Sequence, residues 1–234
     1  MKRMLAAAFA AFALPAAAGD FTNLGALSQQ EFRLVSEDLG AAFSYKGVTP
    51  AKRLGPIGFD VGIEVTQTDV EHSALFAKAG AGDQSKILVP KLHVNVGLFG
   101  GIDLGAFIGG SSDLDASVFG MDGRFALMED TITTPAIALR LSGTRTNGME
   151  VRVGTVAADL MVSKTFTAIT PYAGAGFARI ASKPSGTTAL GEETFNRSRI
   201  FGGVNLNLAI ANFAIEAEKM GDNTSYTAKI GVRF

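Results

Sequence analysis

The two histidines, His72 and His93, are the side chains of this chain best suited to acid–base chemistry near neutral pH. In an extended strand, His93 points to the same side as Asn95 and toward Asp103 of the next stretch. A histidine beside a carboxylate or an amide can serve as the base of a hydrolase, but no serine is clearly placed as its nucleophile. We therefore favour a hydrogen-bonded structural histidine and predict no catalytic residue and no enzymatic activity. An enzyme that uses His93 is the alternative.

Other signals for bound groups are weak. The chain has no cysteine, so its sequence offers neither disulfides nor thiolate metal sites. Asp113 and Asp115 could touch a cation, but two carboxylates are not a ligand set. The segment Gly174–Gly176 matches part of a dinucleotide fingerprint, yet no helical pattern follows it. We expect no cofactor and no metal, and a net charge of −1 without a basic block argues against nucleic acid as a partner.

From Ile57 onward, apolar and polar residues alternate with the period of two that is typical of β-strands. Leu92 and Val94, for example, alternate with Lys91 and His93. In every stretch whose faces can be assigned, the charges share one face and the other face has none. In a barrel the charged face lines the interior, and the expected lumen network is Asp60, Glu64, Lys91, His93, Asp103, Asp122, Arg124, Arg140, Asp159, Arg197, Arg199, Glu216, Glu218, Lys229 and Arg233.

Positive and negative side chains are balanced in this network, which predicts ion pairs across neighbouring strands. The closing stretch carries Lys229 and Arg233. We expect them to pair with acidic residues of both neighbouring strands, namely Glu216, Glu218, Asp60 and Glu64.

The last stretch, Thr224 to Phe234, alternates throughout and stops on an aromatic residue. Its apolar side includes Tyr226, Ile230, Val232 and Phe234. This pattern resembles the assembly signal of bacterial outer-membrane β-barrel proteins, and the resemblance extends architecturally over Ile57 to Phe234. It implies an all-β fold, a location in the outer membrane, and two partners: the outer-membrane lipid and the barrel-assembly machinery, which binds the C-terminal strand.

The first residues carry the pattern of a secretory signal peptide. Lys2 and Arg3 precede an apolar run from Met4 to Leu14, and small residues follow up to Gly19. The run is shorter than the roughly 20 residues of a spanning helix. We expect residues 1–18 to be a cleaved signal peptide, residues 19–55 a periplasmic or lumen-plugging segment with a helix, and residues 56–234 the barrel.

Alternation alone also fits a soluble sandwich, in which a second sheet covers the apolar face. The export signal, the terminal Phe and strands of about 9–11 residues favour a transmembrane barrel. We count about ten antiparallel strands, an even number as bacterial single-chain barrels require, with twelve as the alternative. The long connections 68–86 and 182–194 then lie outside the cell, and the short turns lie in the periplasm.

The N-terminal segment has two interpretations. Ser28 and Glu31 have the spacing of a capping box, and Phe32, Val35 and Leu39 follow at helical spacing. The competing interpretation is a strand over 38–46. A single extra strand would make the count odd, so we expect a helix from Ser28 to about residue 45, in or below the barrel. For the connection 68–86 we expect a solvated loop, with a short helix over 70–78 as the alternative.

A barrel of about ten strands has an interior that side chains can largely fill. We therefore expect either a structural role or a narrow, gated passage for a small solute. A further alternative resembles the hydrophobic-compound transporters whose N-terminal segment plugs the barrel.

Overall fold

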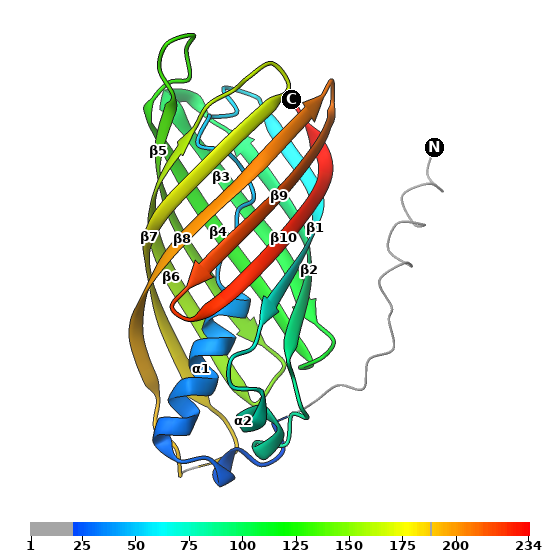
Figure 1. Cartoon of the computed structure of the whole chain (residues 1–234), viewed down its shortest axis with the longest axis vertical. Helices are drawn as coiled ribbons and strands as arrows, with labels where there is room; N and C mark the ends of the chain where they lie inside the picture. The colour runs from blue at the N-terminus through cyan, green and yellow to red at the C-terminus, as the bar shows by residue number, and fades with distance from the viewer. Residues whose placement is uncertain (1–20, 188) are drawn as a thin grey trace, which may run out of the picture.

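The chain folds into one closed, antiparallel β-barrel of ten strands in a computed structural model that describes residues 21–187 and 189–234 (Figure 1). Each strand pairs with the next along the chain, and β1 pairs with β10 to close the wall. The all-β barrel and the count of ten are confirmed, and the alternative of twelve strands is wrong. The expected signal peptide, residues 1–18, lies outside the described residues.

The elements follow one another as a simple up-and-down meander. The helices are η2 (Leu24–Ala26), α1 (Gln29–Phe43), α2 (Ser73–Lys78) and η3 (Phe99–Gly101), and the strands are β1 (Phe59–Asp69), β2 (Lys86–Gly97), β3 (Ile102–Ser111), β4 (Ala116–Met128), β5 (Ala136–Asn147), β6 (Val151–Ser163), β7 (Ile169–Pro184), β8 (Glu193–Leu208), β9 (Ala211–Met220) and β10 (Asn223–Arg233). The strands are 10 to 16 residues long, so most exceed the expected length. None of the helices in the described part of the chain is long and apolar enough to cross a membrane.

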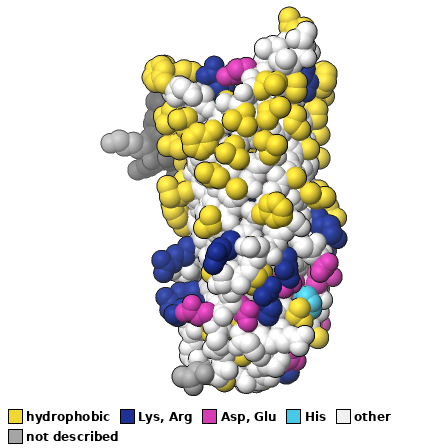
Figure 2. Space-filling model, turned by 90° about the vertical axis from the view of Figure 1, so that its left-hand side faces the viewer, with side chains coloured by type: hydrophobic (Ala, Val, Ile, Leu, Met, Phe, Trp, Pro, Cys, Tyr) yellow, Lys and Arg dark blue, Asp and Glu magenta, His cyan; other side chains and the backbone are white. Residues whose placement is uncertain are grey.

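Alternation along each strand sorts the side chains between the two sides of the wall. In β6, Leu160 and Val162 are 56% and 43% exposed on the outside, whereas Asp159 between neighbouring outward residues is 1% exposed inside. On the face that Figure 2 shows, the result is a hydrophobic band over the upper part of the barrel. A band of this kind is what hydrocarbon covers in a transmembrane barrel.

The strands continue past the hydrophobic band, and there the sequence expectation is wrong. Charges do occur on the outward face of the strands, and Figure 2 shows Lys and Arg side chains gathered below the band. The outward-facing, exposed cations on the strands are Lys86, Arg145, Arg152, Arg179, Lys183 and Lys219. The outward face is therefore free of charge only over the part of each strand that the band covers.

The two ends of the barrel differ. At one end, which we call the loop end, lie α2, the connection 70–85 and the residues 185–187 and 189–192. The opposite end, the turn end, carries the connections 98–101, 129–135, 164–168 and 209–210 and both the start of β1 and the end of β10 (Figure 1). Long loops on one side and short turns on the other are the asymmetry expected of outer-membrane barrels.

Helix α1 begins as the sequence predicts. The Ser28 hydroxyl accepts a hydrogen bond from the Glu31 amide at 3.3 Å, and the Ser28 amide donates to the Glu31 carboxylate at 2.8 Å. Phe32, Val35 and Leu39 are fully buried along one side. The competing strand over 38–46 is wrong, because α1 continues to Phe43 and the chain becomes extended only at Ser44.

The N-terminal segment lies inside the wall. Helix α1 sits at the loop end, and residues 44–58 run along the lumen to the turn end, where β1 begins (Figure 1). Gly40 lets the helix approach β7, since a Cβ on Gly40 would lie 2.6 Å from the Ile180 side chain.

Helix α2 closes the loop end beside α1. The solvated-loop interpretation is wrong for Ser73–Lys78, because Phe76 is fully buried and its ring lies 5.6 Å from that of Phe21. The Lys78 ammonium reaches the Glu31 carboxylate at 2.6 and 2.8 Å.

Candidate functional site

The lumen brings together all residues of the expected network. Every one faces the interior, and all are buried except Arg197 and Arg233, which are partly exposed. Most of them fall into three groups, each of which contacts the N-terminal segment.

The first group is a chain of alternating charges across β5, β6, β8 and β9. The Asp159 carboxylate lies 2.9 Å from Arg140 Nη2 and 3.2 Å from Arg199 Nε. Arg199 Nη2 lies 2.9 Å from Glu218, and Glu218 lies 3.5 Å from Lys46 Nζ of the N-terminal segment. These side chains are at most 1% exposed, so each charge depends on its partner in the absence of water.

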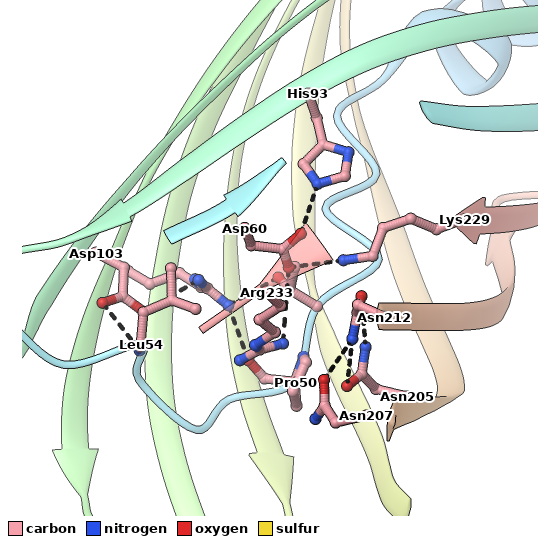
Figure 3. A network of polar contacts seen from close by, with 12 residues as sticks. Pro50, Leu54, Asp60, His93, Asp103, Asn205, Asn207, Asn212, Lys229 and Arg233 are labelled. Atoms are coloured by element: carbon pink, nitrogen blue, oxygen red, sulfur yellow. Dashed lines mark hydrogen bonds and ion pairs between the residues drawn. The ribbon is translucent and has the colours of Figure 1, made fainter. Parts of the chain in front are cut away.

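The second group surrounds His93. The His93 Nε2 atom lies 2.9 Å from the Asp60 carboxylate (Figure 3). The Nδ1 atom lies 3.1 Å from the Glu64 carboxylate. Lys229 donates to Asp60 at 2.8 Å, and Lys91 lies 3.0 Å from Glu64. The expected neighbour Asp103 is not among the contacts of His93, because β2 and β3 are offset so that His93 stands opposite Phe107.

The third group lies toward the turn end. Arg124 donates to Asp103 at 3.0 Å, and Asp103 accepts from the Leu54 amide at 3.0 Å (Figure 3). Arg124 also donates to Thr49 Oγ1 at 2.7 Å and to the Pro50 carbonyl at 2.8 Å. Asp122, also in this group, accepts a hydrogen bond from the Tyr45 hydroxyl at 2.5 Å.

The expected pairing on the closing strand is half right. Lys229 and Arg233 both approach Asp60, at 2.8 and 3.8 Å. Glu216 and Glu218 are not their partners in the described part of the chain, because these residues stand opposite Thr227 and Ser225 of β10. Counted from Lys229, Glu216 therefore lies one inward position closer to the loop end, and Glu218 lies two inward positions closer.

Sequence reasoning missed the part that the N-terminal segment plays in this network. Lys46 donates to the Ala41 carbonyl at 2.5 Å and pairs with Glu218, and the Tyr45 carbonyl accepts from Arg199 at 2.9 Å. No period marks these residues in the sequence. The only available signal was a Lys and a Tyr in a segment otherwise rich in small and apolar residues.

Hydrogen bonds to Asp38 join α1 to the start of β10 and to the residue that precedes α2. Asp38 accepts hydrogen bonds from Asn223 Nδ2 at 2.6 Å and from the His72 amide at 3.0 Å, and its carboxylate lies 3.2 Å from His72 Nδ1. Burial raises the pKa of the Asp38 carboxyl above its ordinary value, and the contacts with Asn223 and His72 offset part of that rise. His72 thus serves as a partner of a buried carboxylate.

The proposed assembly residues lie on the outward face of β10 and at its end. Tyr226, Ile230 and Val232 are 52%, 56% and 41% exposed. The Phe234 ring lies 3.7 Å from that of Phe59, and the two residues exchange backbone hydrogen bonds of 2.7 and 3.0 Å. This pair stands at the seam where the barrel closes.

A closed antiparallel barrel of ten strands with an apolar outer band defines the class of this protein, an outer-membrane-type β-barrel. No family model matches the chain, and no curated protein matches it. Among solved structures, it is similar to the N-terminal β-barrel domain of Pseudomonas aeruginosa OprF, with 12% identity, 74% of this chain and 97% of that chain covered, and a TM-score of 0.38.

Two other solved barrels are similar at the same level. The KdgM porin has 6% identity, with 75% of this chain and 99% of that chain covered and a TM-score of 0.39. The Escherichia coli outer membrane protease OmpT has 10% identity, with 76% and 96% covered and a TM-score of 0.39. A β-barrel fold can host unrelated functions, so the residues of this chain carry the evidence for its function.

Proposed function

We propose that the protein is an outer-membrane barrel with a narrow, gated passage for small polar solutes, closed at rest by its own N-terminal segment. The single observation that supports the proposal is that residues 44–58 occupy the lumen and are held there by polar contacts. The gate is the extended stretch, and α1 is its anchor at the loop end.

Most contacts that hold the gate are polar. The wall donates from Arg199 to the Tyr45 carbonyl and from Arg124 to Thr49 and the Pro50 carbonyl. Ser163 Oγ accepts from the Lys52 amide at 3.0 Å. Hydrogen bonds to charged groups contribute about 1.5–3 kcal/mol each, and Lys46 of the same stretch also pairs with buried Glu218, so we expect the stretch to leave these positions only briefly, when water hydrates the groups that it uncovers. The charged wall that it uncovers is suited to a hydrated passage.

The anchor is held differently. Phe32, Val35, Leu39 and Phe43 of α1 belong to the apolar core at the loop end. Burying side chains of this size contributes about 1.5–3 kcal/mol each, so the helix is expected to stay in place while residues 44–58 move. Movement confined to the polar stretch would open the turn end first.

The test is single-channel recording in planar bilayers with three proteins. The full chain is expected to be closed most of the time with brief openings, and a variant that lacks residues 21–55 is expected to conduct steadily. The chain has no native cysteine, so a Lys52→Cys/Ser163→Cys variant can tie the stretch to β6 without competing thiols. We expect oxidation to abolish the openings and a reductant to restore them.

A structural role is the second candidate, favoured by the dense pairing of buried charges in the lumen. It predicts no conductance from any of the three proteins, and that result would overturn the gated passage. Heat-modifiable gel migration of each variant verifies that the barrel has formed.

The enzyme hypothesis has less support. Both ring nitrogens of His93 lie beside carboxylates, at 2.9 and 3.1 Å, and the side chain is only 4% exposed. A histidine held in this way is suited to bridging Asp60 and Glu64. Loss of a hydrolase activity on His93→Ala, with the barrel intact, would restore the enzyme hypothesis.

A further inference from the structure

The ladder between β2 and β3 stops before β2 does. Its pairs run from Gly97↔Asp103 to Lys91↔Gly109, whereas β2 continues to pair with β1 as far as Lys86. Residues 86–90 therefore have no partner on β3. Pro90 has no amide hydrogen to leave unpaired, and the Leu88 amide lies 3.4 Å from the Asp113 carboxylate.

An apolar groove opens on the outer surface at this interruption. Its volume is about 570 Å³, and its lining includes Ile63, Leu92, Ile108 and Phe119. These four residues form one continuous cross-strand row over β1, β2, β3 and β4.

The groove is hollow because the next row toward the loop end has small side chains. That row contains Gly110, which stands opposite Ser117, and Ser117 stands opposite Asn147. Gly110 contributes no side chain, and Ser117 contributes a short one. The larger apolar residues of the neighbouring row thus form one side of the groove, and the small residues Gly110 and Ser117 form its base.

The apolar row ends at a cation. Phe119 stands directly opposite Arg145 of β5, which faces outward and is exposed. Arg145 forms no ion pair with any carboxylate of residues 21–187 and 189–234, although charges inside the barrel are densely paired. The Asn147 side chain lines the groove two residues further on.

Neighbouring cations extend the positive surface beyond the groove. Arg152 and Lys183 are exposed and stand directly opposite each other on β6 and β7. Like charges in this position destabilise a sheet unless an anion lies between or near them. Lys183 is paired with Glu192, but Arg152 has no such partner in the described part of the chain.

We propose that this groove binds one acyl chain of a phosphorylated lipid of the surrounding membrane, with Arg145 and Asn147 holding the headgroup phosphate. A lipid is the fitting occupant because the groove is apolar along the row from Ile63 to Phe119 and carries the exposed guanidinium of Arg145 at the end of that row. Arginine binds phosphate through two parallel hydrogen bonds, and the amide of Asn147 supplies a further donor.

Native mass spectrometry of the detergent-solubilised full chain tests the site with lipid A and with chemically dephosphorylated lipid A. Arg145→Gln is expected to weaken the binding of lipid A about tenfold and to leave the dephosphorylated lipid unaffected. Ser117→Leu, which fills the groove, is expected to weaken both lipids. Inorganic phosphate alone is expected not to displace lipid A, since it cannot use the apolar row.

Two matched variants serve as controls. Arg179→Gln removes an exposed outward arginine of β7 away from the groove, and Ser198→Leu enlarges an exposed outward serine of β8. Both are expected to bind lipid A like the parent. Binding unchanged in Arg145→Gln and Ser117→Leu would overturn the site, as would an equal loss in Arg179→Gln or displacement by inorganic phosphate. Heat-modifiable migration confirms that each variant forms the barrel.

Discussion

The ion chain through Asp159 gives the sharpest prediction. In the Asp159→Asn variant, Arg140 loses its carboxylate partner, because its contacts at 2.9 and 3.0 Å both end on Asp159. Arg199 retains Glu218 at 2.9 Å. One fully buried guanidinium therefore loses its ion-pair partner, and breaking a buried pair in this way costs about 3–5 kcal/mol.

The assay is equilibrium unfolding in urea, with the protein in lipid vesicles. Far-UV circular dichroism follows the strands, since the chain has no tryptophan for fluorescence. Arg140→Met in the Asp159→Asn background removes the orphaned charge and is expected to recover about 2 kcal/mol. Glu129→Gln is the control, because the Arg53–Glu129 pair is largely exposed and is expected to contribute less than about 1 kcal/mol.

One outcome refutes the reasoning. If Asp159→Asn unfolds within about 1 kcal/mol of the parent, the charge of Arg140 is compensated by water or by another group, and the lumen is wetter than the burial of these side chains indicates.

Three further predictions follow from the N-terminal segment and the seam. Lys78 and the Ser28 contacts lower the pKa of Glu31 from 4.5 to about 2. The ionised carboxylate therefore stabilises the start of α1 above pH 4.5, and this stabilisation is lost as the pH falls through about 2. Amide exchange at the start of α1 should rise over this pH window in the parent, but not in Glu31→Gln. Ser28→Ala should weaken the same helix start by about 1 kcal/mol, measured by amide exchange against Ser73→Ala at the first residue of α2. Phe234→Ala should slow barrel formation in vesicles, because it removes the ring contact with Phe59. Phe166→Ala, in the connection between β6 and β7, should not slow it. Equal rates for the two variants would remove the support for an assembly role of Phe234.

Local pattern was enough for the strands and for α1, but not for α2, where a solvated loop was expected. The period of two predicts the strands because alternate side chains must meet hydrocarbon on one side and a polar interior on the other, as Leu160 and Asp159 do. Helix α1 was predictable for the same kind of reason, since the Ser28–Glu31 box and the buried stripe from Phe32 act within a few residues. The inward direction of the charged network also follows from alternation alone.

Partners across the lumen depended on the tertiary structure. Register and the offset between strands decide that His93 meets Asp60 and Glu64, and that Glu218 meets Arg199 instead of Lys229. These are distances between residues far apart in the chain, and no local period encodes them.

The path of the N-terminal segment is the other feature that only the fold decides. Lys46 and Thr49 meet the charged wall because the barrel closes around them, with α1 packed at one end and β1 beginning at the other. Sequence by itself determined which side chains point inward, since that follows from bond geometry within each strand. The closed wall determined which of them form ion pairs with one another, since that requires all ten strands to be in register at once.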